Sequence, residues 1–318
     1  MPAPDPDTAS CQARFHHRWG HLRDVHVRAL AWLLDSPDLL DPLAAQWQGR
    51  IASLGPVQAA TAGWLTALDA APGELHAWLG ERIPARLGRY AEKLMAFYFQ
   101  RQGVLFAHGL QLRGAHNETL GEFDFLLWEG KELVHWEFAS KFYLLESGLA
   151  APDSDAYVGP NLADTLGAKL RKIMDKQLAL SLHPAAQAIL PQAVARAQAL
   201  VKGWLFYRGP VPAPVSGVSK QHCRGFWCPI EEFDECSADA YILLPRLSWL
   251  APARAEEDQC MSGMELHMRL RDGFERDATP QLIALMRQEA GEWREGERGF
   301  IVPTDWSERA GLARNLVA

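Results

Sequence analysis

Residues 121–144, GEFDFLLWEGKELVHWEFASKFYL, constrain the fold of this chain most strongly because they read as a β-hairpin. On each side of a central turn, the side chains alternate between two faces with the period of two that a strand requires. Gly130 suits the first central position of a tight turn, where the backbone needs a positive φ. With Gly130 and Lys131 as the loop, the register places Asp124 opposite Glu137.

Two facing acids set an electrostatic requirement. Directly opposed Cβ atoms on one face of an antiparallel pair are about 4.5–5.5 Å apart. Carboxylates at that separation repel each other unless a cation or a proton lies between them. The pattern therefore predicts a metal ion or a shared proton at Asp124 and Glu137, and the alternative is an accidental pair at a solvated sheet edge.

The segments that flank the hairpin predict an α/β core. In chain order, the pattern predicts a helix over 86–102, a strand over 104–112, the hairpin, a helix that Asn161 caps and that ends near 181, and a short buried strand over 203–207. The element order is thus α-β-β-β-α-β. Glu92 lies on an apolar flank of the first helix, and Gln177 lies on the inward stripe of the second.

The rest of the chain is predicted to add to this core within one domain. Residues 1–12 read as a disordered tail, and 13–318 read as a single domain. That domain is divided into a helical N-terminal layer over 13–85, the core over 86–208 and an irregular α+β extension over 209–318. In the extension we expect strands at 241–244 and 299–302 and a helix near 280–293.

Composition narrows the classes of protein. The 318-residue chain is 48% hydrophobic, and we find no apolar run of roughly 18 residues that could span a membrane. An N-terminus without an apolar run after basic residues argues against a secretory signal, and five scattered cysteines suggest reduced thiols in the cytoplasm. The net charge of -7 confines any nucleic-acid contact to local basic patches. Oligomeric state is not encoded in any pattern that we recognise.

The acids, the lysine that follows them and the element order resemble the PD-(D/E)XK, or restriction-endonuclease-like, nuclease superfamily, and more specifically an uncharacterised bacterial family within it. The resemblance covers roughly residues 86–208. It implies a mixed central sheet flanked by helices and a Mg²⁺- or Mn²⁺-dependent nuclease that cleaves DNA or RNA. By residue, it implies the following roles: Asp124 and Glu137 as metal ligands, Glu92 as an auxiliary ligand or general base, Lys141 as the charge stabiliser, and Gln177 as a support for the site or a backbone contact.

The position of the lysine departs from the superfamily pattern. Ala139 occupies the lysine's usual place, one residue after the acid, and Lys141 lies two residues further on. Glu137 and Lys141 still share a strand face, but an ideal strand separates them by about 13 Å. A leaning side chain or a β-bulge would have to close that gap. The alternative function is therefore a catalytically inactive nuclease fold that binds nucleic acid or protein.

Basic residues on both predicted helices offer a surface for a nucleic-acid backbone. The residues expected to contact phosphates are Arg89, Lys93, Lys169, Lys172 and Lys176. Ordinary solvated helix faces are the alternative explanation of the same pattern.

Histidine and cysteine offer two further candidates. His135 lies on the acid face beside Glu137, where it either joins the site or serves as a hydrogen-bonded structural residue. The segment QHCRGFWCPIEEFDEC brings together four nitrogen and sulfur ligands that could bind zinc: His222, Cys223, Cys228 and Cys236. Their spacing lacks the paired CxxC units of common zinc sites, so buried free thiols are the simpler interpretation.

Overall fold

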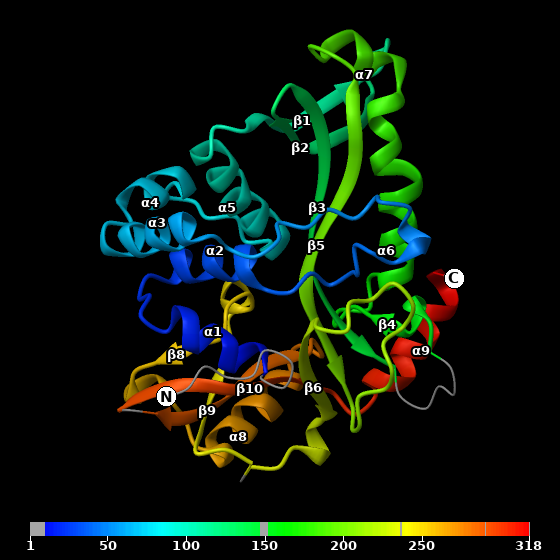
Figure 1. The fold of residues 1–318 in the computed structure, drawn as a ribbon. Coiled ribbons are helices and arrows are strands. Elements are labelled where there is room, and N and C mark those ends of the chain that lie inside the picture. Colours follow the sequence, from blue (N-terminus) through cyan, green and yellow to red (C-terminus); the bar gives the residue numbers. More distant parts are fainter. Residues whose placement is uncertain (1–9, 147–151, 236, 290, 318) are drawn as a thin grey trace.

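One mixed β-sheet runs through the protein and makes it an α/β fold (Figure 1). The computed structural model describes residues 10–146, 152–235, 237–289 and 291–317, and within them ten strands join one sheet. Their main order is β1-β2-β3-β5-β6-β10-β9-β7, with β4 on β3 and β8 on β10. The strands are β1 (Leu105–Arg113), β2 (Thr119–Glu129), β3 (Glu132–Leu145), β4 (Tyr157–Val158), β5 (Val194–Tyr207), β6 (Cys223–Pro229), β7 (Ala240–Leu243), β8 (Arg254–Ala255), β9 (Gln281–Glu289) and β10 (Glu292–Val302).

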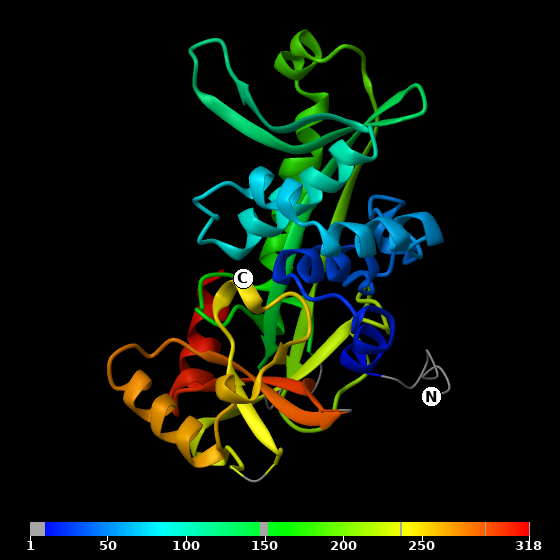
Figure 2. The ribbon, with the colours of Figure 1, turned by 90° about the vertical axis from the view of Figure 1, so that its left-hand side faces the viewer.

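Helices cover both faces of the sheet. The N-terminal helices and α5 lie on one side of the long central strands, and α6 lies on the other (Figure 1). Seen from the side, the β1–β2 hairpin and the C-terminal strands lie at opposite ends of the molecule (Figure 2). The helices are α1 (Cys11–Trp19), α2 (Val25–Asp35), α3 (Ala59–Ala70), α4 (Gly73–Leu79), α5 (Leu87–Arg101), α6 (Leu166–Lys172), α7 (Pro184–Ile189), α8 (Gly263–Phe274) and α9 (Trp306–Val317).

The centre of the sheet is parallel and buried on both faces. Strands β3, β5, β6 and β10 are parallel neighbours, whereas β1–β2–β3 and β10–β9–β7 are antiparallel. Along β5, Leu200 and Trp204 face the core under α2 and α5, while Val201 and Leu205 face the core under α6. Burial of both faces explains why this strand reads as a nearly continuous apolar run.

The predicted hairpin and its register are confirmed. Glu129 pairs with Glu132, and the pairing continues outward to Phe125 and Trp136. Gly130 has a φ of 63°, as the tight turn requires. The predicted helix over 86–102 and strand over 104–112 are confirmed as α5 and β1.

Three sequence predictions about element boundaries were wrong. The strand expected at 203–207 begins at Val194. The helix expected from Asn161 begins at Leu166, because the Thr165 hydroxyl accepts a hydrogen bond of 3.1 Å from the Ala168 N–H and caps it. At the N-terminus, residues 1–9 of the expected tail lie outside the described residues, but α1 starts at Cys11.

The helix expected near 280–293 is instead a strand, β9, which forms a hairpin with β10. Leu282 and Ala284 face one core cluster, while Ile283 and Leu285 face another. A strand buried on both faces has no alternation of polar and apolar residues, so a helix and a strand are hard to distinguish in such a run.

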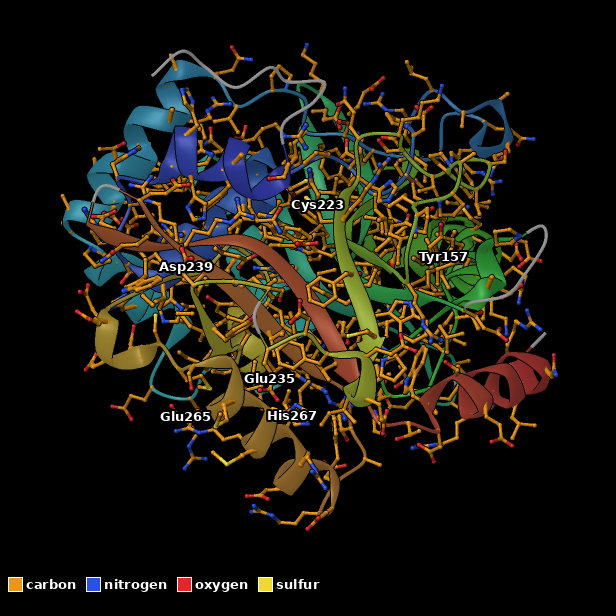
Figure 3. The ribbon with its side chains drawn as sticks, turned by 90° about the horizontal axis from the view of Figure 1, so that it is seen from below. Tyr157, Cys223, Glu235, Asp239, Glu265 and His267 are labelled. Atoms are coloured by element: carbon orange, nitrogen blue, oxygen red, sulfur yellow. The ribbon has the colours of Figure 1, made fainter. Side chains whose placement is uncertain are left out.

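The C-terminal strands therefore extend the central sheet, and α8 packs beside them. Seen from below, α8 places His267 near Glu235, and its Nδ1 lies 2.6 Å from Glu235 Oε1 (Figure 3).

We expect Gly203→Ala to destabilise the protein by about 1–3 kcal/mol, as overpacking of a closed core does. Gly203 pairs with Lys141 across β5 and β3, and a Cβ at this glycine would lie 1.9 Å from the Lys141 carbonyl oxygen. Gly63 in α3 has no neighbour within 4 Å of such a Cβ, so Gly63→Ala is the control and should not destabilise. Urea unfolding of both variants measures the difference, and equal stabilities would contradict this packing.

Candidate functional site

The two hairpin acids lie where β2 separates from β3. The pairing of these strands ends at Phe125 and Trp136, so Asp124 and Glu137 are the next residues outward. At this point Asp124 Oδ2 accepts a hydrogen bond of 2.9 Å from the Phe138 backbone N–H. The Asp124 carboxylate thus accepts the hydrogen bond that a strand amide ordinarily donates to a backbone carbonyl. This hydrogen bond holds the carboxylate within the sheet.

Burial raises the pKa of both acids toward neutral pH. Burial raises the pKa of Asp124 to about 7, and the Glu137 charge adds to this increase, while the Phe138 amide opposes it. Burial likewise raises the pKa of Glu137 to about 7, against the lowering effects of hydrogen bonds to Asp124 and of the Lys169 charge. These carboxyl groups therefore change protonation near neutral pH, and a cation that binds them competes with protons and binds more tightly as the pH rises.

A chain of hydrogen bonds holds Glu137 in place. His135 Nε2 lies 2.7 Å from Glu137 Oε1, and Gln177 Nε2 donates to Glu137 Oε2. Burial lowers the pKa of His135 to about 4, so this histidine is neutral at pH 7 and donates from Nε2. Gln177 Oε1 in turn accepts from Lys169 Nζ at 3.2 Å. The structure therefore brings His135 and Gln177 together with one of the predicted acids.

Glu92, Glu122 and Asp124 form a carboxylate group. One oxygen from each side chain lies within 4.8 Å of the others. Arg89 Nη1 lies 2.8 Å from Glu122 Oε1 and 3.1 Å from Glu92 Oε1, and His108 Nε2 lies 3.0 Å from the same Glu92 oxygen. The cationic Arg89 side chain offsets part of the negative charge that three neighbouring acids create.

Lys141 pairs with Asp164, which is not one of the predicted site acids. Its Nζ lies 3.0 Å from Asp164 Oδ2, which also accepts a hydrogen bond of 3.1 Å from the Tyr143 hydroxyl. Lys169, from α6, is the lysine whose charge lowers the pKa of both Asp124 and Glu137. Burial lowers the pKa of Lys169 itself, and the charges of Lys141 and Lys172 add to that effect.

The other basic residues predicted on these helices divide into paired and exposed ones. Lys93 donates to the Leu79 carbonyl oxygen at 2.8 Å, and Arg89 bridges two acids. Lys172 and Lys176 are exposed. Lys172 and Lys176 thus present solvated positive charge on the helical segment that carries Lys169.

Sequence reasoning missed two members of this arrangement and gave a third a different role. Glu122 lies two residues before Asp124, and the period of two could have placed both acids on one face. His108 lies on β1, whose pairing with β2 sets it opposite Phe125. Lys169 was predicted only as a backbone contact, because its link to Glu137 runs through Gln177 and depends on the backbone beyond α6. Residues Ile173–Gln177 form a π-helical turn there.

The four candidate zinc ligands do not come together within the described residues. His222 Nε2 bonds the Tyr207 hydroxyl at 2.7 Å, while Cys223 and Cys228 pack in different core clusters. Residues five apart on one strand face opposite sides of the sheet, which explains the separation of the two cysteines. Cys236 lies outside the described residues.

The chain belongs to the family described as "Domain of unknown function (DUF1853)", which matches residues 28–302. That range includes the whole carboxylate group and Lys169. Compared with curated proteins and with solved structures, the chain has no significant match to either. Among the described residues, no helix has the length and apolar character needed to cross a membrane.

We expect Asp124→Asn to gain stability relative to the wild type as the pH rises from about 5 to about 8 in metal-free buffer. The folded pKa of Asp124 is raised to about 7 from an ordinary value of 3.8, so proton binding stabilises the folded wild type at low pH. That contribution is lost as the pH rises through the folded pKa, whereas asparagine does not titrate. The difference should change by on the order of 2 kcal/mol.

Urea unfolding at several pH values measures this difference. Asp239→Asn, which removes an exposed acid outside the site, is the control. Identical pH profiles for the two variants would contradict the raised pKa of Asp124.

Proposed function

We propose that this protein is a Mg²⁺- or Mn²⁺-dependent phosphodiesterase that cleaves DNA or RNA in the cytoplasm, with a restriction-endonuclease-like core. The observation that carries the proposal is the convergence of Glu92, Glu122 and Asp124, with the Lys169 charge acting on Asp124. The order α5-β1-β2-β3-α6-β5 around these residues is the order that the resemblance implies, apart from the short insertions between β3 and α6 and between α6 and β5.

The residues present fit a hard divalent cation. Three carboxylates supply the oxygen ligands that Mg²⁺ and Mn²⁺ prefer, and their oxygens are close enough to share one ion. Glu137 lies beside Asp124 and was also predicted as a ligand; in the structure its two oxygens accept hydrogen bonds from His135 and Gln177. When bound, such an ion would polarise a phosphate oxygen and lower the pKa of a water molecule.

The side chains of the protein would position the phosphate and offset its charge. Lys169 Nζ, held at 3.2 Å by Gln177 Oε1, would stabilise the negative charge that develops on the phosphate. His135 holds the Glu137 carboxylate in place, and that carboxylate in turn orients Gln177. Lys172 and Lys176, exposed on the same helical segment, would contact the neighbouring phosphates of the nucleic acid.

Arg89 would move when the site is used. Its side chain is 54% exposed, and it bridges Glu92 and Glu122 without being enclosed by the core. A divalent cation and the Arg89 guanidinium neutralise the same carboxylates, so each reduces the need for the other. Arg89 can then turn outward and contact the nucleic-acid backbone, which is the role that the sequence predicts for it.

We expect wild-type protein to cleave a panel of single- and double-stranded DNA and RNA with Mg²⁺ or Mn²⁺ and not with EDTA. Asp124→Asn should lower the rate by about 100-fold or more, because it removes a charged ligand while keeping the side-chain shape. Asp239→Asn is the matched control, since that acid is exposed and outside the site. Metal-dependent cleavage that is unchanged in Asp124→Asn would remove the proposed site.

A second comparison tests which lysine serves the reaction. Lys169→Met should lower the cleavage rate by about 10- to 100-fold, and Lys141→Met should change it only a few-fold, since Lys141 is engaged by Asp164. Single-turnover rates at saturating metal separate this effect from binding of the substrate. A larger loss of rate in Lys141→Met than in Lys169→Met would instead assign the charge-stabilising role to Lys141.

The alternative function, a nuclease fold that binds nucleic acid without cleaving it, predicts a different outcome in the same assays. Nucleic acid would bind the wild type without cleavage, and neither Mg²⁺ nor Mn²⁺ would raise the melting temperature. The pairing of Lys141 with Asp164 is the observation that favours this alternative. Cleavage that depends on Asp124 would exclude it.

A further inference from the structure

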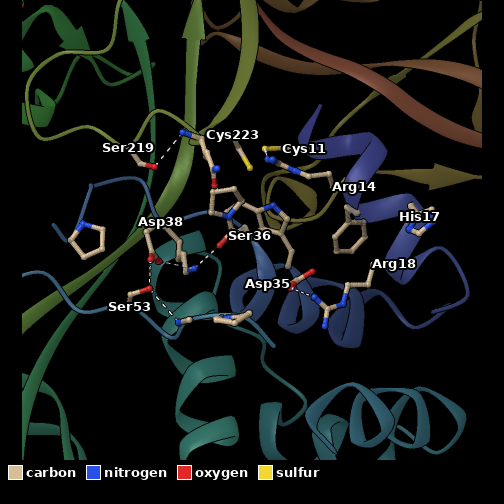
Figure 4. Close-up of a pocket in the computed structure, with 18 residues that line it drawn as sticks. Cys11, Arg14, His17, Arg18, Asp35, Ser36, Asp38, Ser53, Ser219 and Cys223 are labelled. Atoms are coloured by element: carbon tan, nitrogen blue, oxygen red, sulfur yellow. Dashed lines mark hydrogen bonds and ion pairs between the residues drawn. The ribbon is translucent and has the colours of Figure 1, made fainter. Parts of the chain in front are cut away.

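Two cysteines that are far apart in sequence meet at the wall of a pocket that none of the site acids lines. The pocket has a volume of about 540 Å³ and lies between α1, α2 and the start of β6. Cys11, the first residue of α1, and Cys223, the first residue of β6, both line it. Figure 4 shows the two sulfur atoms directed toward each other. None of the roles proposed above uses either thiol.

The surroundings of Cys11 favour its thiolate. Arg14 Nη2 lies 3.2 Å from Cys11 Sγ, and Ser10 caps the helix that begins at Cys11, so the sulfur lies at a helix N-terminus. The pKa of Cys11 is lowered, chiefly by a hydrogen bond from the Cys223 thiol, against the raising effect of burial and with help from Arg14. Burial raises the pKa of Cys223, which therefore stays protonated and donates that hydrogen bond.

The two thiols differ in their access to solvent. Cys11 is half-buried and opens onto the pocket, whereas Cys223 is only 1% exposed. A small, uncharged reagent that enters the pocket therefore meets the more exposed Cys11 more readily than the buried Cys223. This pairing of an accessible thiolate with a buried thiol in contact is the arrangement in which an oxidised cysteine is captured as a disulfide.

We propose that Cys11 and Cys223 form a peroxide-reactive pair that closes reversibly to a disulfide and ties α1 to β6. The Cys11 thiolate attacks one oxygen of hydrogen peroxide, forms an S–OH bond and breaks the O–O bond. The departing hydroxide takes a proton and leaves as water. The Cys223 sulfur then attacks the sulfenic sulfur, and the S–S bond forms as the hydroxyl group leaves with the Cys223 proton as a second water. Peroxide gains two electrons, which the two thiols lose.

Closure would fix the first helix to the sheet. Helix α1 carries Gln12 and His16, which reach Glu295 on β10 at 3.3 Å and 3.1 Å from their side-chain nitrogens. A disulfide from residue 11 to residue 223 encloses most of the chain and would reduce the freedom of the unfolded state. We therefore expect the oxidised protein to melt several degrees higher than the reduced protein.

The test uses the full-length protein, reduced, freed of reductant and treated with stoichiometric hydrogen peroxide at neutral pH. After alkylation of the remaining thiols, a non-reducing digest should contain a peptide that links Cys11 to Cys223, and dithiothreitol should remove it. Cys260→Ser, which changes a half-buried cysteine elsewhere, should form the same link. Cys223→Ser should instead leave Cys11 as a sulfenic acid that reacts with dimedone.

Arg14→Gln provides a test that keeps both cysteines. It should slow formation of the linked peptide by about threefold or more, because it removes the positive charge beside the attacking Cys11 sulfur. The proposal is overturned if both thiols remain alkylatable after peroxide treatment, or if Cys11 oxidises in the wild type without joining Cys223.

Discussion

The hydrogen bond from the Phe138 amide to the Asp124 carboxylate marks the place on which the candidate site depends. Up to Phe125, backbone pairing joins β2 to β3; beyond it, a side chain satisfies the strand amide. Beside this point, Glu122 from the same strand and Glu92 from α5 lie close to Asp124. A buried acid in such a position raises the free energy of the folded state at neutral pH unless a proton or a cation compensates it. The proposed function rests on how the protein meets that requirement.

The compensating charges come from elements on both sides of the sheet. Arg89 reaches two of the acids from α5, and Lys169 acts on Asp124 and Glu137 from α6. The parallel pairing of β3 with β5 anchors the strand that carries Glu137, and Gly203 allows the two backbones to approach closely. Packing of the core therefore determines which positively charged side chains reach the carboxylates. Lys141 is close to Glu137 in sequence but pairs with Asp164 instead.

The hairpin could be predicted from sequence because its alternation, its glycine turn and its register are all local. Glu92 and Gln177 were also predicted in the site, but Glu122, His108 and the position of Lys169 were not, since these depend on tertiary packing and on a π-helical turn at Ile173–Gln177. Likewise β9 was mistaken for a helix because both of its faces are buried. The proximity of Cys11 to Cys223 has no signature in the spacing of the cysteines.

The most direct test of the account is a titration of the purified protein with Mn²⁺, with the free ion followed by electron paramagnetic resonance. The carboxylate group predicts one Mn²⁺ bound per chain in the wild type, displaced by excess Mg²⁺ and lost in Asp124→Asn. Glu265→Gln, which changes an exposed acid on α8, should leave that binding intact. Absence of Mn²⁺ binding in the wild type, or equal binding in Asp124→Asn, would contradict the proposed metal site.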